Sequence, residues 1–209
     1  VLELDWLNTK ATFVLKNNLI KPKIATKFSI ELRGVFHPLI NNPVKNNIDL
    51  KINHKGLIIS GPNTGGKTVA LKSVCLVYLF LNLGLFVPCS FAEVSPIEGL
   101  YYFSHTHQNL SAGLSSFASE SKYYLELLNQ LEPHNLIVVD EIFNSTSSEE
   151  ASALAMSFLE EIHARSNSKV IISTHHQVLK TFMHSKNEYI SAHVGFDFEL
   201  NKPTYKLIT

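Results

Sequence analysis

The sequence predicts an α/β fold in which a mostly parallel sheet is flanked by helices and carries added antiparallel strands. Short apolar segments alternate with longer amphipathic ones along most of the 209 residues, and this alternation is typical of parallel strands joined by helices. A glycine-rich turn, GPNTGGKT at residues 61–68, joins an apolar strand-like run to an apolar helix-like run. The final segment, residues 189–207, alternates like the two strands of a closing hairpin.

The spacing of the apolar residues places the individual elements. A first helix is expected at residues 2–19, because Leu4, Leu7, Ala11 and Val14 recur at three-to-four spacing. A basic, proline-containing connector follows it. Beyond the connector, strands are expected at residues 28–32, 48–52, 57–60, 100–103, 136–140 and 170–173, and helices at residues 67–83, 116–131, 149–165 and 176–184. The chain is therefore expected to divide into the end of a preceding helical arm with its connector, residues 1–27, and an α/β domain, residues 28–209.

The composition limits the class of protein. The chain is 45% hydrophobic and has 18 basic and 18 acidic residues, so it can form one full-sized core and has no overall positive field for nucleic acid. Cys75 and Cys89 lie in apolar surroundings, which favours core thiols in a reducing compartment. The most apolar run, residues 74–89, is interrupted by Asn82 and Pro88 and is too short for a membrane span. The first residues lack the basic segment of a signal peptide, so we expect a cytoplasmic protein with no membrane partner.

The glycine-rich turn matches the phosphate-loop pattern G-x-x-x-x-G-K-[ST], which about 1% of random chains of this length would contain. Its glycines let backbone N–H groups turn toward phosphate oxygens, and the N-terminus of the following helix adds positive partial charge. Lys67 would reach the β- and γ-phosphates, and the Thr68 hydroxyl would bind Mg²⁺. The sequence therefore predicts a site for ATP and Mg²⁺ in which the nucleotide contacts Gly61, Pro62, Asn63, Thr64, Gly65, Gly66, Lys67 and Thr68.

Two further strands end in residues that suit the same site. LIVVDE, residues 136–141, is an apolar strand followed by two acids. Asp140 would hold Mg²⁺ through water, and Glu141 would orient or deprotonate the attacking water; an incidental acidic pair is the alternative. The next apolar strand ends at His175, which is either a contact to the γ-phosphate or a surface or capping histidine.

With these three elements in this order, the chain resembles the ABC-type ATPases and, among them, the MutS family. Asn63 and the double glycine Gly65–Gly66 match the GPN-x-GGK form of the loop in that family. The LSGGQ signature of ABC transporters is absent from the sequence. In its place, NLSAGLSSFASESKYYLELL, residues 109–128, resembles the S-x-F signature of the MutS family at Ser115–Phe117, and GVFHPLI, residues 34–40, is similar to the family's RHPL segment.

Other details resemble the second branch of the family, MutS-two, more than the mismatch-repair branch. Thr64 stands where the repair proteins usually carry Met, and THHQVLK, residues 174–180, is similar to the THYPELK of MutS-two. The tail FDFELNKPTYKLIT, residues 196–209, resembles the F-x-x-x-x-L-x-PTY-x-L ending of that branch. The resemblance extends over essentially the whole chain and implies an ABC-type ATPase domain at residues 28–209.

The resemblance also implies partners and further site residues. It implies a homodimer with two composite ATP sites, in which Ser115 projects onto the γ-phosphate bound by the partner subunit. Gln108 would sense Mg²⁺ or water, and Val44 would pack on the adenine. DNA would be bound through regions mostly outside this chain, with branched recombination intermediates as the substrate, and collided ribosomes are a further implied partner.

One loop departs from the family pattern. After Glu141 the family usually reads x-G-x-G-T, whereas Phe143 and Ser145 replace both glycines here, so left-handed backbone conformations cost more. This departure motivates an alternative of another class, a nucleotide-gated dimerisation module with little turnover. A second alternative, the head domain of another ABC-type DNA-processing ATPase, would require the missing LSGGQ signature. Nothing in the sequence resembles the small nuclease domain of many relatives, so any nuclease activity is expected in a domain absent from this chain.

Overall fold

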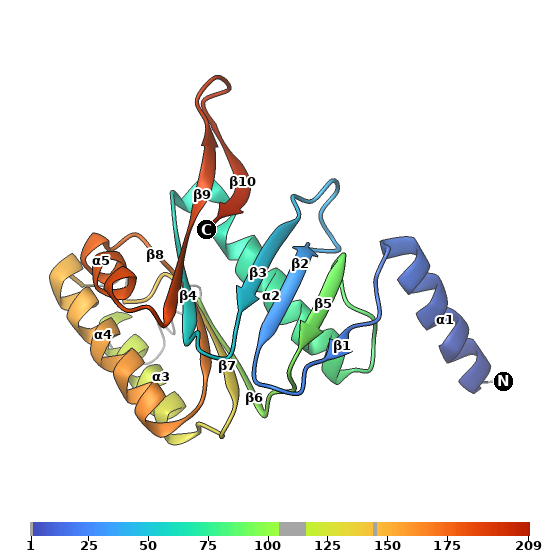
Figure 1. The fold of residues 1–209 in the computed structure, drawn as a ribbon, viewed down its shortest axis with the longest axis horizontal. Coiled ribbons are helices and arrows are strands. Elements are labelled where there is room, and N and C mark those ends of the chain that lie inside the picture. The colour runs from blue at the N-terminus through green and yellow to red at the C-terminus, as the bar shows by residue number, and fades with distance from the viewer. Residues whose placement is uncertain (1, 105–115, 144–145) are drawn as a thin grey trace. The chain divides into compact units, whose positions relative to one another are not determined.

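A computed structural model describes residues 2–104, 116–143 and 146–209 of the chain. It has a mixed α/β fold with both parallel and antiparallel strands, as the sequence predicts (Figure 1). The chain forms two compact units, one of Val1–Ile52 with Val69–Pro96 and the other of Asn53–Thr68 with Ile97–Thr209. The candidate site residues from Gly61 to Thr68 and from Asp140 onward belong to the second unit.

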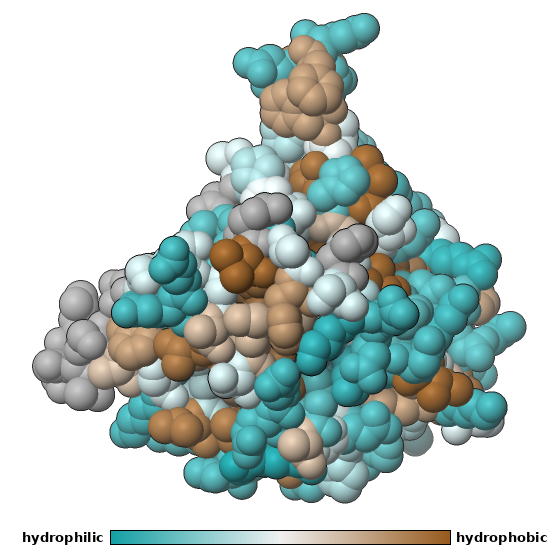
Figure 2. Space-filling model, turned by 60° about the vertical axis from the view of Figure 1, so that its left-hand side comes forward, coloured by the Kyte–Doolittle hydropathy of each residue, from teal (hydrophilic) through white to brown (hydrophobic). Residues whose placement is uncertain are grey.

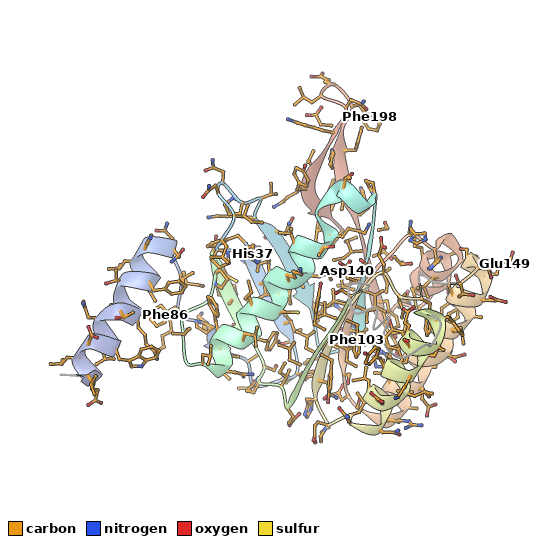
Figure 3. All side chains as sticks on the ribbon, turned by 180° about the vertical axis from the view of Figure 1, so that it is seen from behind. His37, Phe86, Phe103, Asp140, Glu149 and Phe198 are labelled. Carbon is orange, nitrogen blue, oxygen red and sulfur yellow. The ribbon has the colours of Figure 1, made fainter. Side chains whose placement is uncertain are left out.

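The first unit contains a four-stranded sheet in the order β1-β5-β2-β3. β1 runs parallel to β5, and the other two pairings are antiparallel. Two of the strands, β1 and β5, were not predicted. Helix α1 has no buried residue, and α2 lies along one face of this sheet (Figures 1 and 3). The elements are α1 Leu2–Asn17, β1 Lys23–Ile24, β2 Ile30–Val35, β3 Asn46–Leu50, α2 Lys67–Asn82, which belongs to this unit from Val69 onward, and β5 Phe91–Val94.

The second unit is built on a six-stranded sheet in the order β10-β9-β4-β8-β7-β6. All neighbouring strands are parallel except β9 and β10, which form the predicted antiparallel hairpin. β4, β7 and β8 are almost wholly buried, which explains why they are continuous apolar runs rather than alternating ones. The strands are β4 Gly56–Ser60, β6 Gly99–Ser104, β7 Asn135–Asp140, β8 Lys169–Thr174, β9 Tyr189–Asp197 and β10 Lys202–Ile208.

Three helices cover one face of this sheet: α3 Ser116–Asn129, α4 Ser148–Arg165 and α5 Gln177–Ser185 (Figure 1). Alternate residues of the strands face these helices and form one core with them, which includes Val139, Ile172, Phe158 and Tyr124. Helix α4 begins with a side-chain cap, because the Ser147 hydroxyl accepts a hydrogen bond from the Glu150 backbone N–H at 3.4 Å.

The strand order decides where the site lies. β8 lies between β4 and β7, so the carboxyl ends of these three parallel strands adjoin at one edge of the sheet.

The β9–β10 hairpin is the other notable feature of this unit, and hydrophobic side chains stand among hydrophilic ones along it (Figure 2). Phe198 at its tip is 88% exposed (Figure 3). None of the helices in the described part of the chain is long and apolar enough to cross a membrane.

Candidate functional site

The turn between β4 and α2 has the compact backbone of a phosphate loop. It contains a short 3-10 helix, Asn63–Gly65, which ends at Gly66 in the left-handed region with φ 80°. Gly61 has φ 142°. Residues with a Cβ rarely adopt either conformation. The helix α2 begins directly afterwards at Lys67, so its unpaired N–H groups lie next to the turn.

The glycines of this turn also lie against the β9–β10 hairpin. A Cβ on Gly61 would lie 3.0 Å from the Val194 side chain, and one on Gly65 would lie 3.1 Å from it. A Cβ on Gly66 would lie 3.0 Å from Tyr205 Cδ1. These distances are shorter than ordinary van der Waals contact. The hairpin therefore supports the turn from one side, a role for Val194 and Tyr205 that no local pattern indicates.

Lys67 points back into the turn. It is 2% exposed, and its Nζ donates a hydrogen bond to the Gly61 carbonyl oxygen at 2.7 Å. Burial lowers the pKa of Lys67, and the carboxylates of Glu141 and Asp140 act in the opposite direction. The Lys67 ammonium thus lies close enough to the carboxylates of Asp140 and Glu141 to interact with them electrostatically.

The structure brings the predicted metal-binding residues into direct contact. Thr68 Oγ1 donates a hydrogen bond to Asp140 Oδ2 at 2.5 Å, across 72 residues of sequence. Asp140 Oδ1 accepts a hydrogen bond from Ser173 Oγ at 2.6 Å, and the Glu141 backbone N–H donates to the same Ser173 oxygen at 2.9 Å. Ser173, at position five of β8, was not predicted as a site residue.

The loop after Asp140 has an unusual backbone. Glu141 has φ 62° and Phe143 has φ 50°, both in the left-handed region that residues with side chains rarely adopt. Phe143 occupies the position of the first family glycine, and it keeps a conformation that suits glycine. Its N–H donates to Glu120 Oε1 at 2.6 Å, and its ring centroid lies 4.9 Å from that of Tyr124. The contacts of Phe143 with Glu120 and Tyr124 of helix α3 thus stabilise a backbone conformation that glycine would adopt without them.

The two adjacent histidines after β8 differ in exposure. His175, the predicted phosphate contact, is exposed at the edge of the sheet that carries the turn and the acids. His176 is 3% exposed, and its Nδ1 lies 3.1 Å from Ser148 Oγ of α4. Burial, followed by the neighbouring His175, lowers the pKa of His176. His176 is therefore a packed structural residue, and His175 is the one of the pair that solvent or a ligand can reach.

The three remaining candidates lie outside the described residues of the second unit. Ser115 and Gln108 lie outside the described residues. Val44 belongs to the first unit, between β2 and β3, and is 40% exposed.

Comparison with known proteins agrees with these motifs. A family profile for MutS domain V matches residues 57–207. The chain belongs to the MutS family. The matched range begins in β4 and ends in β10, so the MutS domain V match contains Lys67, Asp140, Glu141 and His175 together with the hairpin that supports the turn.

Several bacterial proteins named Endonuclease MutS2 are similar to nearly the whole chain. The protein of Geobacillus sp. (strain WCH70) is 34% identical over 209 residues, which are 99% of this chain and 26% of that protein. The proteins of Lactiplantibacillus plantarum and Bacillus cytotoxicus are each 33% identical, over 98% and 100% of this chain. These relatives support the MutS2 branch of the MutS family. The chain spans about a quarter of their length.

Proposed function

We propose that this chain is the ABC-type ATPase module of a MutS2 protein, which binds ATP with Mg²⁺ and hydrolyses it. The observation that carries the proposal is the 2.5 Å hydrogen bond between Thr68 Oγ1 and Asp140 Oδ2. It joins the phosphate-loop turn to the acidic end of β7, and these are the two parts that a phosphoryl-transfer site needs next to each other.

The turn supplies the nucleotide contacts in this proposal. The backbone N–H groups of residues 61–68 and the N-terminus of α2 would surround the phosphates, since a helix N-terminus favours anions. When ATP binds, the Lys67 ammonium would replace its hydrogen bond to the Gly61 carbonyl oxygen with hydrogen bonds to phosphate oxygens. Its buried position strengthens that attraction, because charges interact more strongly away from water.

The residues present fit Mg²⁺. A threonine hydroxyl and a carboxylate are the hard oxygen donors that this cation prefers, and it usually keeps water and phosphate oxygens as its other ligands. No group of three or more His, Cys, Asp or Glu side chains suited to a metal occurs among the described residues. Thr68 and Asp140 would therefore hold a cation that completes its shell with phosphate and water. Bound there, Mg²⁺ neutralises charge on the phosphates.

Glu141 and His175 would act on the reacting end of the nucleotide. The Glu141 carboxylate follows Asp140 directly and would orient the attacking water and accept its proton. His175 is exposed at the end of β8 and would donate a hydrogen bond to the γ-phosphate. In a head-to-tail homodimer, Ser115 and Gln108 would complete the site, and Val44 would contact the adenine.

The work done with ATP is also part of the proposal. ATP binding would close the dimer, and hydrolysis would reopen it. The similarity to MutS2 proteins favours DNA as the partner, bound through parts of the protein outside this chain, with branched recombination intermediates or a collided ribosome as the substrate. The relatives are named endonucleases, and we assign any nuclease activity to those other parts.

The central test compares ATP hydrolysis by the full-length wild-type protein and by Glu141→Gln, with and without branched DNA. The variant is expected to lose roughly 100-fold in kcat and to keep its affinity for ATP, because the phosphate-loop turn is unchanged. Glu126→Gln changes an exposed acid of α3 and is the matched control. A wild-type rate no higher than that of Glu141→Gln in every condition would refute the ATPase proposal.

The dimer is tested separately. Light scattering of Glu141→Gln with ATP and Mg²⁺ is expected to give a two-chain species, because this variant holds unhydrolysed ATP. A monomer at high protein concentration would contradict the composite site.

A second candidate function is a nucleotide-gated dimerisation module with little turnover. The left-handed Phe143, packed against Tyr124 where the family has glycine, favours it, because a loop fixed by a buried aromatic ring has less freedom to rearrange during a reaction cycle. ATP-dependent dimerisation by the wild-type protein without hydrolysis would select this function over the ATPase.

A further inference from the structure

Ser173 connects the two acidic residues of the candidate site through a single oxygen atom. Its side chain is 0% exposed. Its Oγ donates a hydrogen bond to Asp140 Oδ1 at 2.6 Å and accepts one from the Glu141 backbone N–H at 2.9 Å. A hydroxyl has one proton to donate, so the direction of both bonds is fixed by these partners.

The sheet brings these groups together. β7 and β8 are parallel neighbours, and Asp140 pairs with Ser173 in their register. Ser173 is the first hydroxyl after the buried apolar residues Val170, Ile171 and Ile172. A buried hydroxyl in such a strand requires hydrogen-bond partners, and here both partners belong to the acidic pair on the next strand.

The two hydrogen bonds to Asp140 fix the plane of its carboxylate. Ser173 engages Oδ1, and Thr68 engages Oδ2 at 2.5 Å. Thr68 is the other residue that the proposed function assigns to the cation, so Oδ2 is the carboxylate oxygen nearer the proposed metal position. Ser173 therefore holds the carboxylate by its other oxygen, which leaves Oδ2 directed at the proposed metal position.

The hydrogen bond to Glu141 acts on its backbone. Glu141 has φ 62°, a conformation that residues with side chains rarely adopt and that surrounding contacts must maintain. The N–H bond to the buried Ser173 oxygen is such a contact. It sets the direction in which the Glu141 side chain leaves the main chain.

We infer that Ser173 is a positioning residue for ATP hydrolysis: its hydroxyl orients the Asp140 carboxylate toward Mg²⁺ and the Glu141 carboxylate toward the attacking water. This inference rests on the proposed ATPase function. Ser173 touches none of the reacting atoms in this role. The phosphate-loop turn is supported by other residues, Val194 and Tyr205, so the loss of the Ser173 hydroxyl acts on hydrolysis and leaves nucleotide binding in place.

The test uses Ser173→Ala and Ser173→Thr in the full-length protein. Ser173→Ala is expected to lower kcat about 10- to 100-fold, since misorientation of reacting groups costs on that order. Its Kd for a fluorescent ADP analogue, measured without Mg²⁺, should stay within about twofold of wild type. Ser173→Thr keeps the hydroxyl and should recover most of the lost rate.

A second readout needs no turnover. Hydrogen exchange of the Glu141 amide, measured at single-residue resolution in the nucleotide-free protein, should become about tenfold faster in Ser173→Ala, because the amide loses its acceptor. Ser152→Ala is the matched control. Ser152 is also 0% exposed, and its hydroxyl donates to the Ser148 carbonyl oxygen at 2.6 Å, within helix α4.

The outcomes separate this inference from the proposed function. If Ser173→Ala keeps kcat within twofold of wild type, the positioning role is overturned. It is also overturned if Ser173→Ala and the control Ser152→Ala show the same losses of kcat and of nucleotide affinity. If the wild-type protein does not hydrolyse ATP, the proposed function fails, and the role of Ser173 in hydrolysis fails with it. If the wild-type protein hydrolyses ATP but the Glu141 amide exchanges at an unchanged rate in Ser173→Ala, only the positioning role is overturned, because the Ser173 hydroxyl then does not hold the Glu141 backbone.

Discussion

Phe143 is expected to show an inverted order of stability when its side chain is removed: Phe143→Gly should be more stable than Phe143→Ala. The usual order is the reverse, because glycine gains more backbone freedom in the unfolded chain than alanine does. The inversion is expected because Phe143 has φ 50°, a conformation that glycine adopts at almost no cost.

The magnitudes follow from the structure. Phe143 is 4% exposed and packs on Tyr124, so both truncations remove a buried aromatic ring at a cost of about 3–5 kcal/mol. Alanine keeps the left-handed penalty of about 1–2 kcal/mol, whereas glycine relieves it and loses about 0.5–1 kcal/mol to the unfolded state. Phe143→Gly is therefore expected to be more stable than Phe143→Ala by up to about 1.5 kcal/mol, although both are less stable than wild type.

Urea unfolding monitored by circular dichroism measures these differences. The neighbouring Ile142 provides the control, because it is 0% exposed and its φ is not positive. Ile142→Gly should be less stable than Ile142→Ala by about 0.5–1 kcal/mol, in the usual order. If Phe143→Ala proves more stable than Phe143→Gly, which is the usual order expected at Ile142, the left-handed conformation of Phe143 and the explanation built on it are wrong.

Three further predictions concern other parts of the chain. Gly66→Ala should weaken nucleotide binding about tenfold in a fluorescence titration, since a left-handed penalty of about 1–2 kcal/mol acts on the phosphate-loop turn. Gly84→Ala is the control: Gly84 also has a positive φ, 64°, but a Cβ there would meet nothing within 4 Å, and the Kd should be unchanged. Burial lowers the pKa of His163 to about 4, so the unfolded chain binds more protons between about pH 4 and 6.5. The free energy of unfolding should therefore fall by on the order of 3 kcal/mol as pH drops through that range, and His163→Phe should reduce this loss in urea titrations. Ser147→Ala removes the α4 cap and should lower the free energy of unfolding by about 1 kcal/mol, a change that an unaltered Tm would contradict.

The strands and helices of the second unit were predictable because their signals are local. β4, β7 and β8 are short apolar runs bounded by polar residues, and the cap at Ser147 with Glu150 marks the start of α4. The strands β1 and β5 were missed. β1 has two residues, and β5 has four that include a charged one. Strands this short are formed by their partners, and they carry no periodicity long enough to detect.

The candidate site was predictable only in part, because only some of its residues belong to local sequence motifs. The contact between Thr68 and Asp140 follows from two motifs, each of which is recognisable in the sequence. Ser173 has no motif, because its importance comes from a register that pairs it with Asp140. Val194 and Tyr205 likewise reach the turn only because the hairpin lies beside β4.

The sequence by itself determined the phosphate-loop turn, the acidic strand end, the order of most elements and the relationship to the MutS family. These are properties of residue type and of spacing within about ten positions, and the chain expresses them through backbone geometry and hydrophobic periodicity. Only the tertiary structure decided the strand order, the left-handed Phe143 and the hydrogen bonds of Ser173. Each of these depends on side chains from distant parts of the chain meeting in one place, and no local pattern encodes that meeting.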